Sequence, residues 1–141
     1  MPVDTVRREL AHEDPLAWIY WYSVSKCVEI EAKPAAPIAL YRSAMSKVLE
    51  VAKQKGVRKL LTNAEELDKL SGDDVLWTEA HWAPEAMKLG ITHIAVVIPK
   101  TIASYLVIEK MALTFAPVIK EGFEERFFAD SKQAREWLEK Q

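Results

Sequence analysis

The sequence has little cysteine and little glycine, and each shortage excludes a class of site. Cys27 is the only cysteine among 141 residues, so neither an internal disulfide nor a cysteine-based metal cage can form. A phosphate loop or a dinucleotide fingerprint needs clustered glycines in front of a helix. The chain has four isolated glycines, of which three look like terminators of helices or loops: Gly56, Gly72, Gly90 and Gly122.

The chain also lacks a strong charge of one sign and a long apolar run. Its formal net charge is −2 and its basic residues are interleaved with acids, which argues against a nucleic-acid partner and a polybasic membrane patch. The longest apolar runs, such as 94–99, are far too short to cross a bilayer. Residues 1–15 are charged throughout, unlike a secretory signal. With a single unpaired thiol, these features predict a cytoplasmic protein.

Catalytic signatures are missing too. There is no G-x-S-x-G motif, and Cys27 has no histidine near it in sequence. His12, His81 and His93 are widely spaced, without a second histidine three or four residues away, so no metal site and no cofactor are predicted. We therefore expect a non-enzymatic protein. One alternative is an unfamiliar enzyme with His81 and Glu85 as acid–base partners.

The amino-terminal half alternates strand and helix patterns. Residues 18–22 are aromatic and β-branched, and residues 27–32 alternate apolar with polar side chains, which predicts an antiparallel hairpin. Apolar residues then recur at helical spacing over 38–55, and Gly56 caps the end. Residues 57–62 form the next predicted strand.

The following segment predicts an interrupted helix and a central strand. Ser71 is a suitable N-cap for a helix that runs to about Leu89. Pro84 lies inside this helix and implies a kink or break after Trp82, because proline lacks the amide hydrogen. Residues 92–98 are almost continuously apolar, as in a strand covered on both faces.

The carboxyl-terminal part adds two helices and a strand. We predict a helix over 102–119, broken near Pro117, and a strand over 123–128. Asp130 and Gln133 suggest a capping box for the last helix. That helix should bury Ala134, Trp137 and Leu138.

The predicted element order is β-β-α-β-α-β-α-β-α. It indicates an α/β domain with a mixed, mostly parallel sheet of about five strands, one antiparallel edge and about four helices. By length and composition this is one domain, and we assign residues 16–141 to it. Residues 1–15 are interpreted as an N-terminal tail or a short surface-docked segment.

Several stretches make the chain similar to the small bacterial SpoIIAA-like, or STAS-like, α/β proteins. They are 41–45 with 56–61, the most specific pair 74–77 with 82–86 and Gly90, the strand 94–99, and 122–123, 127–128 and 134–138. Pro34 departs from the pattern, since relatives commonly have glycine there, and residues 1–15 exceed the usual start. The resemblance implies a STAS-like fold, frequent dimers, and roles in regulation or ligand binding.

The resemblance also draws attention to Ser71. In STAS-type anti-sigma antagonists the regulatory phosphoserine lies near the start of a helix that follows a central strand, and Ser71 is close to that place. A helix N-terminus favours an added phosphate, whereas Asp73 and Asp74 would repel it. Ser71 is therefore a candidate phosphorylation site with a plain N-cap as the alternative.

Two aromatic or apolar surfaces are candidates for a ligand or a partner. Trp77 and His81 share a helix face, whereas Trp82 lies on another, so at least one indole should face a groove or an interface. The alternative is that both indoles pack at the edge of the core. The helix over 102–119 is apolar nearly all round, which suggests that a partner subunit or a ligand covers the side that does not face the sheet. Core packing alone is the alternative. Its candidate contact residues are Tyr105, Met111 and Phe115.

The sequence thus favours a regulatory or binding domain that acts by protein association, as a homodimer through these surfaces. A carrier or sensor of a small apolar ligand such as a lipid, with a pocket beneath the Pro84-kinked helix, is the first alternative. A phospho-switched protein similar to an anti-sigma-factor antagonist is the second.

Overall fold

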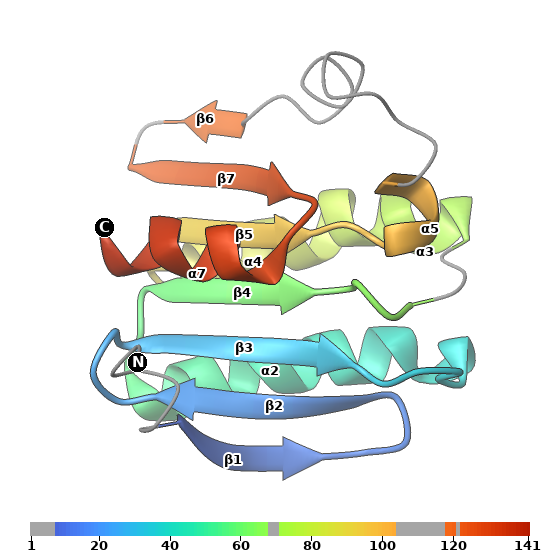
Figure 1. Ribbon diagram of the computed structural model, residues 1–141. Coiled ribbons are helices and arrows are strands. Elements are labelled where there is room, and N and C mark those ends of the chain that lie inside the picture. The colour runs from blue at the N-terminus through green and yellow to red at the C-terminus, as the bar shows by residue number, and fades with distance from the viewer. Residues whose placement is uncertain (1–7, 68–70, 104–117, 121) are drawn as a thin grey trace.

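The computed structural model describes residues 8–67, 71–103, 118–120 and 122–141. Within these residues seven strands form one sheet in the order β1-β2-β3-β4-β5-β7-β6 (Figure 1). The strands are β1 (Arg8–Glu13), β2 (Ala17–Tyr22), β3 (Cys27–Ala32), β4 (Lys59–Asn63), β5 (His93–Val97), β6 (Val118–Lys120) and β7 (Phe123–Phe128). The α/β class predicted from the sequence is confirmed.

The centre of the sheet is parallel and both edges are antiparallel. Strands β3, β4, β5 and β7 run in one direction, while β1 and β2 on one side and β6 on the other add antiparallel pairs. The predicted β2–β3 hairpin is present, closed by the Lys26 amide on the Tyr22 carbonyl at 2.9 Å. The connections between parallel strands need helices, which accounts for the alternating pattern in the sequence.

Helix α2 (Tyr41–Lys55) follows a single 3₁₀ turn, η1 (Ile38–Leu40). Its apolar stripe packs on β2 and β3, and Gly56 ends it in the left-handed conformation at φ +65°. The buried members of the stripe are Tyr41, Ala44, Met45, Val48, Leu49, Val51 and Ala52.

The second long helical region is interrupted, as Pro84 predicts. It consists of α3 (Gly72–Trp77), a π-helical turn η2 (Thr78–Trp82) and α4 (Ala83–Lys88). The Ala83 amide reaches back five residues to the Thr78 carbonyl, and Pro84 lies in the first turn of α4, where its missing amide hydrogen costs little. The irregularity begins at Thr78, before the position after Trp82 where the sequence predicted it.

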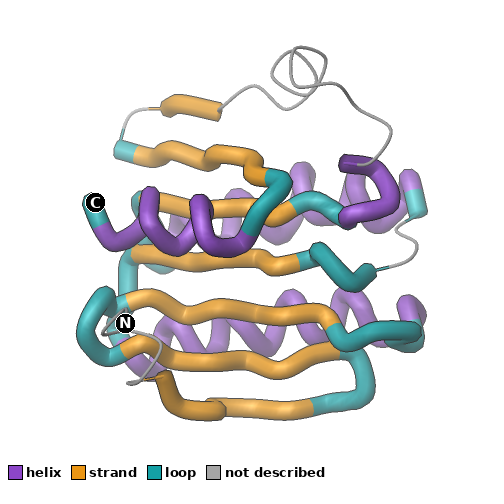
Figure 2. The backbone as a smooth tube through the Cα atoms, in the orientation of Figure 1, coloured by secondary structure: helices purple, strands orange, loops and turns teal. Residues whose placement is uncertain are grey.

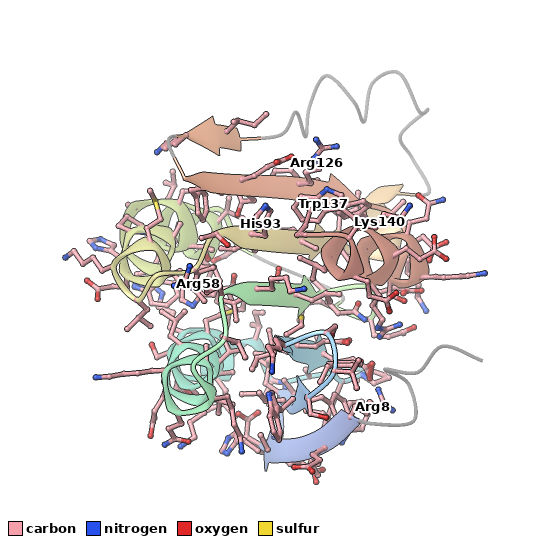
Figure 3. All side chains as sticks on the ribbon, turned by 90° about the vertical axis from the view of Figure 1, so that its left-hand side faces the viewer. Arg8, Arg58, His93, Arg126, Trp137 and Lys140 are labelled. Atoms are coloured by element: carbon pink, nitrogen blue, oxygen red, sulfur yellow. The ribbon has the colours of Figure 1, made fainter. Side chains whose placement is uncertain are left out.

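The sheet has a helical layer on each face. Figure 1 shows α2 and α4 behind the sheet and α7 (Ser131–Glu139) in front, and Figure 3 shows the same layers along the strands. Asp130 caps α7 as predicted, but its carboxylate accepts from the Lys132 amide at 2.7 Å, where a capping box would use the Gln133 amide. Two cores result, one under α2 and α4 and a smaller one under α7.

Two predicted boundaries need correction. Residues 8–13, inside the predicted tail, form the edge strand β1 against β2, which brings Arg8 to 4.0 Å from the centre of the Tyr20 ring. Residues 118–120 form β6 and do not continue a helix to residue 119, because Ile119 pairs with Glu124 across a turn at Gly122, φ +73°. The helix predicted over 102–119 otherwise begins as α5 (Lys100–Ala103), and residues 104–117 lie outside the described residues.

Candidate pocket at the carboxyl ends of the parallel strands

A cavity of about 220 Å³ lies beside the sheet at the carboxyl ends of the parallel strands. These ends are the arrowheads of β3, β4, β5 and β7 in Figure 1, and the loops that leave them are drawn in Figure 2. Ligands of open α/β sheets commonly bind at this end. The cavity exists because α2 and the α3–η2 segment do not close over the sheet here.

One row of side chains across the four parallel strands forms the floor. Ile30 is paired with Thr62, Thr62 with Val96, and Val96 with Phe127, and all four line the cavity. Thr62 and Val96 are half-buried although β4 and β5 are central strands, whereas Leu60 and Ile94, two residues earlier, are fully buried. In the part of the chain that the structure describes, the helical layer is therefore complete over the earlier row and open over this one.

The walls come from both helices and from the loops that follow β4 and β5. Tyr41 and Met45 of α2 face Val75, Thr78, Glu79 and Trp82 of α3–η2 across the opening, and the loop residues are Ala64, Leu67, Ile98 and Pro99. Most of these side chains are apolar. Glu79 and Val75 are exposed, so the cavity reaches the surface along this helix.

The Tyr41 hydroxyl and the Thr78 hydroxyl connect the two walls through a 2.7 Å hydrogen bond. Thr78 also donates to the Asp74 carbonyl, and Arg42 forms a 2.9 Å ion pair with Asp74. Burial raises the pKa of the Tyr41 phenol, although the bond to Thr78 acts in the opposite direction. These contacts hold α2 and α3 together above the cavity.

Trp82 closes the inner end of the cavity. Its indole is buried and donates from Nε1 to the Met45 carbonyl of α2 at 2.7 Å. The wider π turn between Thr78 and Trp82 places this side chain under α4 and against α2. The indole is therefore both a wall of the cavity and a link between the two helices.

Glu125 is the unexpected polar group of the cavity. It lies in the neighbouring row of the sheet, where it pairs with Ile94 and continues the fully buried residues Val28, Leu60 and Ile94. Glu125 itself is only 5% exposed. Among the described residues, none forms a hydrogen bond or an ion pair with its carboxyl group. Burial, reinforced by the negative charge of Glu79 and opposed by Lys120, raises the pKa of Glu125 to about 7.

The residues that sequence reasoning selected are dispersed. Trp82 lines the cavity, whereas Trp77 is half-buried outside it, edge-on to Tyr41 with ring centres 6.2 Å apart and with Arg42 over its face at 5.4 Å. His81 is exposed and does not line the cavity. Tyr105, Met111 and Phe115 lie outside the described residues.

Ser71 has the geometry of an N-cap. It is exposed, and its hydroxyl accepts from the Asp74 amide at 3.0 Å, with Asp73 and Asp74 in the first turn. His81 and Glu85, the alternative acid–base pair, are both exposed, and Glu85 is paired with Lys88 at 3.3 Å. In the described part of the chain, no three histidine, cysteine or acidic residues are grouped so that they could hold a metal ion.

A second buried carboxylate lies on the opposite face of the sheet, under α7. Glu29 is fully buried and accepts from the Tyr22 hydroxyl at 2.6 Å, the Asn63 amide at 3.2 Å, and the Arg135 guanidinium at 2.9 and 3.2 Å. Burial and the Glu29 charge raise the pKa of the Tyr22 phenol. Every oxygen has partners, so this cluster is structural, in contrast to Glu125.

A family model with the description SpoIIAA-like matches residues 28–139, which include every cavity-lining residue except Leu16. The chain belongs to the SpoIIAA-like family. The resemblance seen in the sequence is thereby confirmed, and with it the fold that it implied. No curated protein and no solved structure matches the chain. None of the helices in the described part of this SpoIIAA-like chain is long and apolar enough to cross a membrane.

Proposed function

We propose that this SpoIIAA-like domain is a non-enzymatic binding protein that takes up a small, largely apolar ligand in the cavity. The observation that carries the proposal is the row of Ile30, Thr62, Val96 and Phe127, which lines the cavity and in which Thr62 and Val96 of the two central strands are only half-buried. Burial of apolar area stabilises a protein, so an uncovered row over two central strands loses stability that a ligand could restore.

The size of the cavity sets the size of the ligand. An apolar cavity of about 150 Å³ is large enough for benzene. A volume of about 220 Å³ therefore suits a ligand of roughly seven to eleven non-hydrogen atoms, or one end of a longer chain that leaves past Val75 and Glu79. A sensor or carrier of such a molecule works by association, in agreement with a regulatory family.

Toluene is a suitable first probe because it is neutral and fits the volume. We expect backbone amide signals of Ile30, Thr62 and Val96 to move in a ¹H–¹⁵N NMR titration. Val96→Phe fills the cavity from its floor and should abolish these shifts, and Thr62→Phe is an independent filling variant. Val24→Phe, the same substitution at an exposed turn residue, is the matched control. Absence of shifts in the wild type, or equal shifts in folded Val96→Phe protein, would contradict the proposal.

Protein association through α3 is the second candidate, since regulation by protein interaction is what a SpoIIAA-like domain suggests. Val75 and Leu76 are 44% and 67% exposed, next to Trp77 on one short helix. Adjacent exposed apolar side chains favour a protein contact. Native mass spectrometry distinguishes the two candidates: a dimer that Leu76→Glu converts to monomer supports association, and a monomer with a reproducible added mass supports the ligand.

The phospho-switch at Ser71 is the third candidate. Its only support is the place of Ser71 at the start of α3, exposed and next to Asp73 and Asp74. A phosphate there would disrupt the existing hydrogen bond to the Asp74 amide and repel both carboxylates.

A further inference from the structure

The charged groups that line the cavity in the described part of the chain all have the same sign. Glu125 lies inside it and Glu79 lies at its opening, and among the described lining residues there is no lysine, arginine or histidine. The neutral polar groups are Tyr41, Thr62, Asn63 and Thr78. Tyr41 and Thr78 already bond to each other, and Asn63 bonds to Glu29 and to the Glu65 amide. In the described part of the chain, the lining is therefore an apolar surface with one acidic group, Glu125, that has no hydrogen-bond partner.

A buried carboxyl group without partners is rare in proteins, because its lost hydration costs several kcal/mol. Glu29 in the same sheet shows the usual solution, with partners on both oxygens. Glu125 has no such partner among the described residues, although it is only 5% exposed and lines the cavity. An acidic group at the wall of an open apolar cavity, without a partner among the described residues, indicates a ligand that supplies the missing hydrogen-bond donors.

We propose, on the basis of the proposed function, that the ligand is a small primary amine on an apolar body, with its ammonium group on Glu125. The apolar body would lie on the row of Ile30, Thr62 and Val96, against Trp82. An ammonium ion donates up to three hydrogen bonds and carries a positive charge, so it can supply both the donors and the opposite charge that the Glu125 carboxylate needs. Trp82 and Phe127 also line the cavity, and the face of an aromatic ring attracts cations.

The same charges disfavour the other common class of amphiphile. A fatty acid or a phosphate ester would bring a negative charge next to Glu125 and Glu79, with no cation in the described lining to offset it. Lys120, on the edge strand β6, acts on Glu125 from outside the cavity lining. The cavity therefore discriminates between amphiphiles by the sign of their polar end.

Binding of an amine should depend on pH in one direction. Among the described residues, the charged groups at the site are Glu125 from β7, Glu79 from η2 and Lys120 from β6. The pKa of Glu125 is about 7, and an ammonium ion pairs with the ionised carboxylate, so below this pH binding must also remove the proton from Glu125. Aliphatic amines remain protonated well above neutral pH, as lysine does. Affinity should therefore rise between about pH 6 and pH 8.

Three probes that share one apolar body test the proposal by isothermal titration calorimetry at pH 8. They are 2-phenylethylamine, 2-phenylethanol and phenylacetate. We expect the amine to bind at least tenfold more tightly than the alcohol and phenylacetate to show no binding. In Glu125→Gln the amine and the alcohol should agree within threefold. Glu124→Gln, the neighbouring carboxylate on the opposite face of β7, is the matched control and should keep the tenfold preference.

The outcomes separate this inference from the proposed function. Equal binding of the amine and the alcohol, tighter binding of phenylacetate, or a preference that survives in Glu125→Gln would overturn the amine proposal and leave an apolar ligand in place. If toluene and all three probes fail to bind, both proposals fall. A tenfold amine preference that is lost in Glu125→Gln and weaker at pH 6 supports both.

Discussion

At the scale of single residues, Trp82 is the side chain whose loss should be most informative. Trp82→Phe keeps an aromatic ring in the core but removes the Nε1 donor and leaves the Met45 carbonyl without it. A buried polar group that loses its partner costs about 1–3 kcal/mol. We expect urea unfolding to show a loss of about 2 kcal/mol, and Trp77→Phe to lose less, because Trp77 is only half-buried. Equal losses would contradict this role of the Trp82 indole.

The sequence identified Trp82 but could not distinguish it from Trp77. Helical spacing separates the two faces, whereas burial of Trp82 depends on the π turn, which follows from packing against α2 and has no simple sequence signature. Glu125 could have been found. It alternates with Phe123 and Phe127, and a carboxyl between two inward aromatic residues of one strand must face the same side. That Glu125 has no hydrogen-bond partner among the described residues could be seen only in the structure.

At the scale of secondary structure, α7 is attached to the sheet by the ion pair between the half-buried Arg135 and the fully buried Glu29, as well as by Ala134 and Leu138. Arg135→Met should destabilise the protein by about 3 kcal/mol, because it leaves the Glu29 charge buried without its cation. Lys132→Met, on an exposed position of the same helix, should change stability by less than about 0.5 kcal/mol. Urea unfolding measures both values.

A double variant separates the ion pair from simple packing. Glu29→Leu with Arg135→Met removes both charges, so its stability should recover most of the loss seen in Arg135→Met. Hydrogen exchange should show α7 amides opening faster in Arg135→Met than in the double variant. If the loss in the double variant equals the sum of the losses in Glu29→Leu alone and Arg135→Met alone, the ion pair does not hold the helix.

The elements themselves were largely predictable, and the exceptions share a cause. The hairpin, α2, β4, β5, β7 and α7 carry complete patterns, because each has an apolar face and a terminator such as Gly56 or Asp130. Strands β1 and β6 lie at the two edges and bury little, so their sequences show no alternation. Glu29 interrupts the inward face of β3. Its role could not be predicted from the sequence, because its partner Arg135 lies 106 residues away.

At the scale of the whole molecule, Glu125 should make folding stability depend on pH near neutrality. Its pKa in the folded protein is about 7, above the ordinary carboxyl value of 4.5, so between these two values the folded state binds more protons than the unfolded state. Stability therefore falls as pH rises through this window and stays lower above it. The expected loss between about pH 5 and pH 8 is on the order of 2 kcal/mol.

Glu125→Gln isolates this contribution, because it keeps the shape of the side chain and cannot ionise. Its stability relative to the wild type should increase by about 2 kcal/mol from pH 5 to pH 8 in parallel urea titrations. Glu79→Gln removes a charge that raises the pKa of Glu125, so its loss of stability should end at a lower pH and be smaller than that of the wild type. Parallel wild-type and Glu125→Gln curves would mean that Glu125 has the same pKa in the folded and unfolded states, which contradicts this prediction. Saturation with an amine should reduce the loss of wild-type stability between about pH 5 and pH 8, since a ligand that binds only the folded state with ionised Glu125 stabilises that state most where the unliganded protein is weakest.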